Sequence, residues 1–336
     1  MSEADLSPVL VVIPCLNEEA HLDGLLRQIL RDPAAERFRV VVADGGSTDA
    51  SRRIAAEFAQ VDRRVVLLDN PQRIQSAGVN RAVAVHGADC EHLIRIDAHA
   101  DYPDGYGSSL LATAERTGAD SVVVSMVSNG VGCFQKAAAA AQNSVLGAGG
   151  SRHRKTGEGG WIDHGHHALM RLDAYRRAGG YDESFVANED AELDARIVAQ
   201  GGRIWLSGET SVVYYPRSDA LRLFRQYLNY GAGRVRTLRK HRMKPKARQM
   251  LPLAVAPAMV LAPLGLLHPV FAVPAVLWAA ACLGFGLLLG LKSRDACAAA
   301  SGVPAMIMHL AWSIGFLREA LRAGLSAPAP AAAPAE

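Results

Sequence analysis

The sequence lacks paired cysteine motifs, a secretory signal and a strong net charge, and each absence narrows the function classes open to it. Its five cysteines form no CxxC pair and no metal-like spacing, and their odd number and wide scatter suit a reducing compartment. We expect each thiol to be a small, buried, apolar side chain. The first apolar run, 9–13, is too short for a signal peptide and predicts a strand. A net charge of +3 gives no support for a nucleic-acid partner.

Charge is also missing from one long segment near the C-terminus. Residues 251–291 contain no Asp, Glu, Lys or Arg. Two apolar stretches, 249–266 and 270–291, are each close to the length that crosses a bilayer, and we expect a helical hairpin there. A weaker stretch, 297–317, leaves two alternatives open, a third span or a helix at the membrane interface. The Ala- and Pro-rich tail, 325–336, is expected to be disordered.

Positive charge gathers immediately before this hairpin. Eight basic residues, which we call the basic collar, are Arg234, Arg236, Arg239, Lys240, Arg242, Lys244, Lys246 and Arg248. Lys and Arg beside a membrane segment mark its cytoplasmic side. We therefore expect the chain at the inner (cytoplasmic) membrane with its N-terminal part facing the cytoplasm. Membrane lipid head groups or a lipid-linked diphosphate are candidate ligands of the collar.

The N-terminal part alternates short β-rich runs with helical stretches. The runs that predict strands are 8–14, 38–44, 64–69, 92–97 and 120–126. This alternation predicts βαβ units and a largely parallel, doubly wound sheet, in which ligands bind at the carboxyl ends of the strands.

Three features lie between and beyond these strands. Asn17 is predicted as the N-cap of the first helix, which directs Leu22, Leu25, Leu26, Ile29 and Leu30 inward. The Gly-rich segment 147–160 has too few apolar residues for a core element, and it predicts a functional loop. A mixed α/β stretch, 161–217, precedes a basic and partly helical segment, 219–248.

Four polar clusters follow predicted strand ends or loops, in the order 14–19, 44–49, 97–101 and 188–190. Each alone is a weak signal, because a turn or a helix cap would explain it. Their order resembles that of glycosyltransferase family 2, inverting enzymes of the GT-A fold, and the likeness covers residues 8 to about 240. The closer resemblance is to the succinoglycan-type exopolysaccharide glycosyltransferases. It is carried by DAHADYP (97–103), IDHGHHALMR (162–171), GGYDESFVANEDAELDARI (179–197) and RQYLNYGAGRVRTLRKHR (225–242).

This resemblance implies the fold and the domains. We expect a Rossmann-like, doubly wound mixed sheet of the GT-A type as the catalytic domain over 1–240. The basic collar and the membrane anchor are expected to follow over 241–320.

The resemblance also implies a UDP-sugar donor and the residues that bind it. Asp44 is similar to the family's base-binding aspartate, and an ionised carboxylate accepts the N–H of uracil well. Arg73 matches a position near the donor diphosphate, where a guanidinium can hold two phosphate oxygens. The complete set of donor-binding candidates is Pro14, Asn17, Glu18, Asp44, Arg73, Asn80 and Asp97.

Residues 97–99 occupy the place of the family's Asp-x-Asp motif. Asp97 and His99 are the predicted ligands of a divalent cation, Mn²⁺ or Mg²⁺, that bridges the donor diphosphate and acts as a Lewis acid. His99 replaces the second Asp of the motif. Mn²⁺ accepts nitrogen ligands more readily than Mg²⁺ does, so the sequence favours Mn²⁺.

Asp190 resembles the family's catalytic base, which takes the proton of the acceptor hydroxyl during in-line attack. Two roles stay open for Glu189, orienting Asp190 or contacting the acceptor. The candidates for contact with the acceptor or a diphosphate are His166, His167, Gln226 and Arg234. The histidines lack the HExxH spacing of a zinc site. Gln226 and Arg234 match only part of the Gln-x-x-Arg-Trp motif of processive relatives, which favours a single addition.

Together these residues predict an inverting transfer of one sugar, with glucose as the best single choice. The implied acceptor is a polyprenyl-diphosphate-linked saccharide in exopolysaccharide biosynthesis. Two alternatives stay open, a polyprenyl-phosphate sugar transferase and a non-catalytic nucleotide-sugar-binding membrane scaffold.

Overall fold

The computed structural model describes residues 7–149, 157–245 and 247–325. Contacts divide the chain into two units, 1–130 with 150–216 and 131–149 with 217–336. Helix α9 (Ala220–Lys240) belongs to the second unit, and the domain bounds expected from the sequence stay a prediction. Residues 150–156 of the predicted loop 147–160, Lys246 of the basic collar, and the tail from 326 onward lie outside the described residues.

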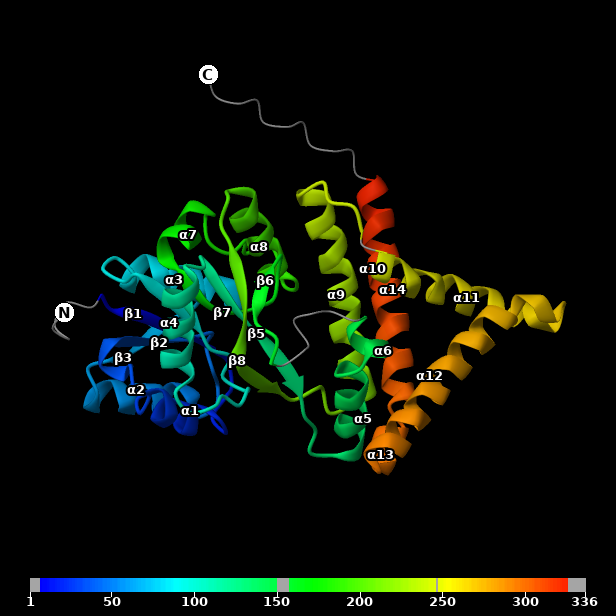
Figure 1. Cartoon of the computed structure of the whole chain (residues 1–336), viewed down its shortest axis with the longest axis horizontal. Helices are drawn as coiled ribbons and strands as arrows, with labels where there is room; N and C mark the ends of the chain where they lie inside the picture. The colour runs from blue at the N-terminus through cyan, green and yellow to red at the C-terminus, as the bar shows by residue number, and fades with distance from the viewer. Residues whose placement is uncertain (1–6, 150–156, 246, 326–336) are drawn as a thin grey trace, which may run out of the picture. The chain divides into compact units, whose positions relative to one another are not determined.

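The first unit is built on one eight-stranded mixed sheet with the order β3-β2-β1-β4-β7-β5-β8-β6 (Figure 1). Its strands are β1 (Val9–Cys15), β2 (Phe38–Asp44), β3 (Val65–Asp69), β4 (His92–Arg95), β5 (Ser121–Ser128), β6 (Gly160–Ile162), β7 (His166–Arg171) and β8 (Ile204–Tyr214). Strands β3, β2, β1 and β4 are mutually parallel, and β7 runs antiparallel between β4 and β5. The five strands predicted from apolar runs and the mixed α/β class are confirmed.

Helices cover both faces of this sheet because successive strand residues point to opposite sides. In β1, Val9, Val11 and Ile13 belong to one buried cluster, and Leu10 and Val12 belong to the other. The first cluster takes in α1 (Leu22–Ile29), α2 (Ser51–Val61) and α4 (Tyr106–Thr117). The second takes in α3 (Gln75–His86), α7 (Leu172–Arg177) and α8 (Glu189–Ala199).

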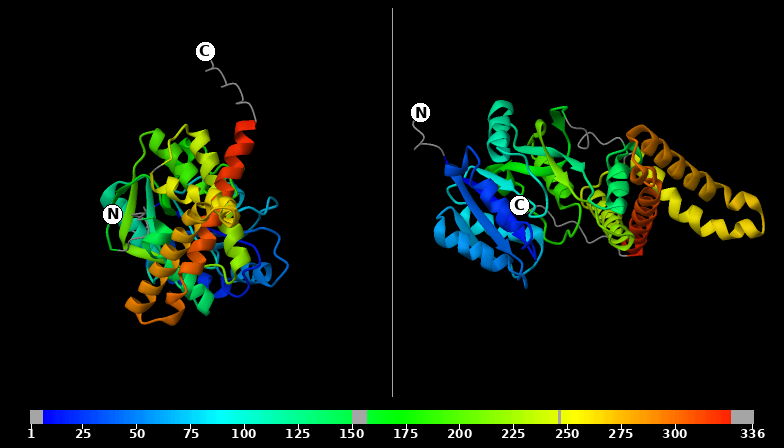
Figure 2. Two further views of the ribbon diagram at one scale, coloured as in Figure 1. Left: turned by 90° about the vertical axis from the view of Figure 1, so that its right-hand side faces the viewer. Right: turned by 90° about the horizontal axis from the view of Figure 1, so that it is seen from below.

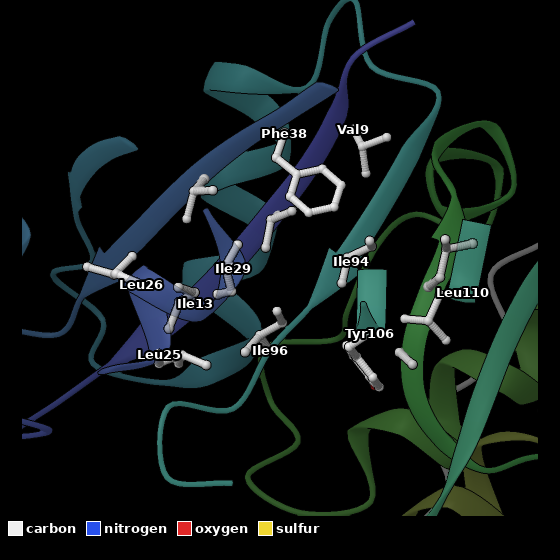
Figure 3. Close-up of a cluster of buried hydrophobic side chains, with 14 of the residues drawn as sticks. Val9, Ile13, Leu25, Leu26, Ile29, Phe38, Ile94, Ile96, Tyr106 and Leu110 are labelled. Carbon is white, nitrogen blue, oxygen red and sulfur yellow. The ribbon is translucent and has the colours of Figure 1, made fainter. Parts of the chain in front are cut away.

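The inward face predicted for the first helix is confirmed for four of its five residues, and Leu30 is half-buried. Leu22, Leu25, Leu26 and Ile29 are buried, and Figure 3 shows three of them directed at the β1 side chains. Burying one such side chain contributes about 1.5–3 kcal/mol, so this face suffices to fix α1 on the sheet.

The prediction that Asn17 caps this helix is wrong. The helix begins at Leu22 with His21 as its N-cap, and Asn17 has a left-handed backbone with φ of 58°. The Asn17 side chain instead accepts the N–H of Thr48 at 2.8 Å. Its amide is therefore used to join two loops rather than to start a helix.

The second unit is helical in its described part. It contains α5 (Cys133–Gln142), α6 (Val145–Ala148), α9, α10 (Ala247–Met250), α12 (Val273–Ser293), α13 (Ala296–Ala299) and α14 (Gly302–Leu325). The first predicted span divides into η4 (Leu251–Ala254), α11 (Val255–Leu261) and η5 (Ala262–Leu266), because prolines within it remove backbone donors. In the described chain, α12 and the segment 296–322 are long and apolar enough to cross a membrane, and they fit an anchor.

Two of the five cysteines depart from the sequence-based expectation. Cys133 of α5 and Cys297 of α13 form a disulfide across 164 positions of the chain, whereas Cys15, Cys90 and Cys282 are free and buried. The expectation of five unpaired apolar thiols is therefore wrong for this pair. Wide spacing in the sequence does not prevent two thiols from meeting once α13 packs near α5.

Candidate active site

Two loops at the carboxyl ends of β1 and β2 form one continuous structure. Cys15 and Asp44 are paired at the last register position of the two strands. The N–H of Glu18 donates to the Ser51 hydroxyl at 2.7 Å, and the Glu19 carboxylate accepts the N–H of Ala50 at 2.8 Å. The loops 14–19 and 44–51, which carry the donor-binding candidates Pro14, Asn17, Glu18 and Asp44, thus brace each other.

Asp44 is the buried centre of the second loop. Its carboxylate accepts the N–H groups of Gly46 and Ser47, both at 3.2 Å, and pairs with Arg52 Nη1 at 3.2 Å. A carboxylate offers about four lone-pair directions, so it can hold this turn and still accept one more N–H from a ligand. The predicted base-binding role is compatible with this geometry and stays a prediction.

Arg73 lies beside the same turn. Its backbone is left-handed, with φ of 60°. A Cβ added to Gly46 would lie 3.7 Å from the Arg73 guanidinium, so the two are direct neighbours. The exposed guanidinium beside Gly46 is available to an anionic ligand.

Asn80, in contrast, is hydrogen-bonded on all sides within the protein. Its amide nitrogen donates to the Tyr181 carbonyl and to Glu183, and its oxygen accepts from the Tyr175 hydroxyl and the Tyr181 N–H. An asparagine side chain supports about four such bonds, so none remains for a donor sugar. The structure gives Asn80 the role of anchoring the segment before α8 and does not support a donor contact.

The centre of the site is a cluster of charged side chains that surrounds Arg95. Arg95 is the last residue of β4 and is 3% exposed. Its guanidinium bonds Asp190 at 2.5 Å and 3.3 Å, and lies 3.7 Å from Asp97 and 3.9 Å from Glu189. The His166 ring lies between Asp97 and Asp190, at 3.6 Å from each carboxylate. One buried cation therefore holds together the predicted metal ligand and both predicted catalytic residues.

The pKa values of the two carboxyls are driven apart in this cluster. Burial alone would raise the pKa of Asp190, but the charge of Arg95, with help from His167 and His166, holds it well below the usual value. Burial and the neighbouring Asp190 charge raise the pKa of Glu189 to about 7. Because the two acids are adjacent and coupled, a proton taken up by the pair resides on Glu189.

His167 has a structural place, and the predicted acceptor contact is not supported. The residue is completely buried. Its Nδ1 lies 2.6 Å from the Tyr181 hydroxyl and its Nε2 lies 2.7 Å from Asp194. Both ring nitrogens are occupied, so His167 positions Tyr181, whose hydroxyl also donates to Asp190 at 3.3 Å.

The predicted metal ligands are brought to the rim of this cluster. Asp97 accepts a hydrogen bond from the Gln75 amide at 2.8 Å through one oxygen and faces His166 through the other. His99 Nδ1 lies 3.0 Å from Glu18, which links the metal motif to the first loop. Among the described residues no group of three acidic, His or Cys side chains could hold a metal ion. The predicted role of Asp97 and His99 as ligands of a divalent cation therefore stays a prediction.

Gln226 and Arg234 lie on α9, in the second unit. The amide of Gln226 donates to the Tyr230 hydroxyl at 3.0 Å along the same helix. Their predicted contact with the acceptor or the diphosphate stays a prediction.

Arg95 is the functional residue that the sequence interpretation missed. It lies in HLIRID, in a strand that is otherwise apolar and buried. A lone arginine in a buried strand is costly unless it is paired, and this is a signal that could have revealed it. Its partner Asp190 is 95 positions away, so the pairing itself was not predictable from the local sequence.

Comparison with known proteins agrees with this geometry. The sequence model of "Glycosyl transferase family 2" matches residues 10–179. The succinoglycan biosynthesis protein ExoA of Rhizobium meliloti (strain 1021) is 54% identical over 312 residues, which cover 93% of this chain and 94% of that protein. A dolichyl N-acetyl-alpha-D-glucosaminyl phosphate 3-beta-D-2,3-diacetamido-2,3-dideoxy-beta-D-glucuronosyltransferase of Methanococcus voltae is 20% identical over 68% of this chain and 74% of that protein.

A solved structure supports the fold. A mannosyltransferase from Pyrobaculum calidifontis, in complex with GDP-Man and Mn²⁺, superposes with a TM-score of 0.60 at 20% identity. The match covers 94% of this chain and 88% of that one. At this identity the likeness shows the GT-A architecture alone. Together with the sequence matches, it establishes that the chain is a glycosyltransferase and belongs to glycosyl transferase family 2.

Proposed function

We propose that this glycosyltransferase transfers one sugar, with inversion, from a UDP-sugar to a polyprenyl-diphosphate-linked saccharide during the biosynthesis of a succinoglycan-type exopolysaccharide. Glucose is the donor sugar that we favour. The identity of 54% to a succinoglycan biosynthesis protein over nearly the whole chain supports the pathway class. The apolar hairpin supports an acceptor that is fixed in the bilayer.

The observation that carries the proposal is the carboxylate pair held by Arg95. Inversion requires a base opposite the leaving group, and the best base has a pKa near the working pH. Asp190 stays ionised and is oriented by Arg95 and Tyr181, while Glu189, with a pKa of about 7, can retain the proton. The pair thus removes the proton from the acceptor hydroxyl. Asp190 supplies a fixed negative charge, and the proton then stays on Glu189.

The donor is held at the opposite side of the same site. Asp44 is proposed to accept a hydrogen bond from the uracil ring, with Pro14, Asn17 and Glu18 beside it. Arg73 is proposed to pair with the diphosphate. Asp97 and His99 would hold a divalent cation together with diphosphate oxygens, and such a cation stabilises the charge on the leaving nucleotide. The Glu18–His99 contact at 3.0 Å joins the loop 14–19 to this position, so the two parts of the proposed donor site touch each other.

The location that we propose is the inner membrane, with the catalytic residues on the cytoplasmic side. The exposed residues of the basic collar support this orientation, because positive charge beside a membrane segment is retained in the cytoplasm. A UDP-sugar made in the cytoplasm would then reach the site directly.

The test is a panel of labelled UDP-sugars incubated with purified chain and an extract of lipid-linked saccharides. We expect one donor to give an organic-soluble product, and Asp190→Asn to abolish it while UDP still binds. Glu115→Gln, a change at an exposed position on α4, is the matched control and should be fully active. No product with any UDP-sugar would overturn the proposed donor class. Transfer to bare polyprenyl phosphate that persists in Asp190→Asn would favour the phosphate transferase.

A further inference from the structure

The helical hairpin formed by 251–293 has an exposed and apolar outer surface. From 251 to 291 it carries no Asp, Glu, Lys or Arg. Leu266 and Leu267 at its tip are 94% and 82% exposed, and Leu277, Leu288 and other side chains along α12 are also exposed. Figures 1 and 2 show the hairpin, in yellow and orange, projecting away from α5, α9 and α14. Such a continuous exposed apolar surface fits the hydrocarbon of a bilayer.

Helix α14 is also apolar enough to cross a membrane, but its surroundings differ. It lies parallel to α9 along most of its length. Leu223 of α9 packs in one cluster with Ala305 and Met308, and Arg236 pairs with Glu319 at 2.7 Å further along both helices. Between these points the backbones touch. A Cβ at Gly231 would overlap the Trp312 carbonyl oxygen, and one at Gly315 would overlap that of Leu228.

The α9 helix is not suited to hydrocarbon, because basic side chains are exposed near both of its ends. Its exposed basic residues are Arg222, Arg225, Arg236, Arg239 and Lys240. Burying a charged side chain in hydrocarbon is costly, and five of them on one helix strongly disfavour its insertion. A helix in backbone contact with α9 remains at the same depth. The close α9–α14 crossing therefore keeps α14 out of the hydrocarbon as well.

The two ends of the hairpin carry the same charge. Arg239, Lys240 and Arg242 precede it, and Lys292 and Arg294 follow it, all with exposed side chains. A segment that crossed to the other side would place one of these groups on the opposite face. Basic residues at both ends, and none at the tip, indicate a hairpin that returns to the face it left. The 21 residues of α12 extend about 31 Å, which matches the thickness of the hydrocarbon core.

From these observations we infer that the hairpin 251–293 is the one membrane insertion in the described chain, that it enters and leaves by the same face, and that α14 is a supporting helix outside the bilayer. The base of the hairpin is fixed to α14 by polar and close backbone contacts. The Ser313 hydroxyl donates to the Leu253 carbonyl at 3.1 Å and accepts the N–H of Ala256 at 3.2 Å. Gly290 of α12 approaches Ala299 so closely that an added Cβ would meet its backbone at 2.5 Å.

The test uses single added cysteines and a membrane-impermeant maleimide on sealed vesicles of known orientation. Val303→Cys and Leu321→Cys lie near opposite ends of α14, at positions 49% and 69% exposed. We expect both to react in the same vesicle population, and Leu266→Cys at the tip not to react from that face. The unaltered chain measures background labelling of its native cysteines. Labelling of positions 303 and 321 from opposite faces would show that α14 spans the membrane. Labelling of positions 266 and 303 from the same face would show that the hairpin does not insert.

A second measurement does not depend on labelling. Leu277→Asp combined with Leu288→Asp places two charges on the exposed face of α12 and should release most of the chain into the carbonate-soluble fraction. Val303→Asp is the matched control, because it adds a charge to an exposed apolar position of α14, and it should remain in the membrane pellet. Equal release of both variants, or of neither, would overturn the inference.

Discussion

Glu189 makes the stability of the protein depend on pH in a direction that can be calculated. Its pKa rises from the ordinary value of 4.5 to about 7 in the folded protein, because burial and the charge of Asp190 disfavour its ionised form. The folded state thus holds the proton more tightly than the unfolded state does. Ionisation of Glu189 therefore destabilises the fold, and the loss grows as the pH rises from about 4.5 to about 7 and is constant above that.

The substitution Glu189→Gln removes this loss while it keeps the shape of the side chain. A shift from 4.5 to about 7 corresponds to about 3 kcal/mol. The variant should be more stable than the unaltered protein by about 1 kcal/mol at pH 5 and by about 3 kcal/mol at pH 8. For a domain of this size the gain is roughly 2–4 °C in Tm at pH 5 and roughly 6–12 °C at pH 8.

Thermal unfolding of purified protein in detergent, followed by tryptophan fluorescence at the two pH values, measures the effect. Glu115→Gln is again the control, since substitution of an exposed side chain changes stability by less than about 0.5 kcal/mol at either pH. A gain for Glu189→Gln that is the same at pH 5 and pH 8, or a loss at pH 8, would refute the reasoning. Because the same group is proposed to retain the proton, kcat of the unaltered enzyme should rise with pH through about 7 and kcat of the variant should fall at least tenfold.

Three further outcomes are expected. Arg95→Met leaves the buried Asp190 carboxylate without its cation, so it should lower stability by about 3–5 kcal/mol in a denaturant titration, and adding Asp190→Asn should restore part of that loss. Asp44→Asn removes the charge that accepts the two N–H groups of its turn, so it should raise KM for the UDP-sugar at least tenfold and change kcat less. EDTA should abolish transfer, with Mn²⁺ restoring more activity than Mg²⁺, and His99→Asp should reverse this preference; an unchanged preference would separate His99 from the metal.

The strands were predictable because each is a short apolar run bounded by polar residues. The same holds for Asp97 and Asp190, since residues at strand ends and helix starts meet at one edge of the sheet. What local sequence could not show is the reversed strand β7, which inserts between β4 and β5 and delivers His166 to the two carboxylates. Its pairing depends on contacts between strands far apart in the chain, not on its composition.

Polar side chains were harder to interpret than apolar ones because several partners compete for each. Asn17 had a helix-cap pattern, yet its amide joins two loops. Asn80 and His167 matched donor and acceptor positions, yet tertiary hydrogen bonds occupy their polar atoms. The Cys133–Cys297 disulfide likewise depends on helix packing, and the spacing of the cysteines in the sequence does not indicate it.

The crossing at Gly231 and Gly315 restricts how this protein can diverge. The Cβ of an alanine at either position would overlap a main-chain oxygen of the other helix. Neither site therefore accepts even the smallest side chain unless the two helices move apart. Chains that keep a glycine at both positions, together with an uncharged hairpin between them, should share the same way of resting on the membrane even where their catalytic residues differ. The two glycines then serve as a signature for sorting related sequences by anchor type, independently of the sugar that each enzyme transfers.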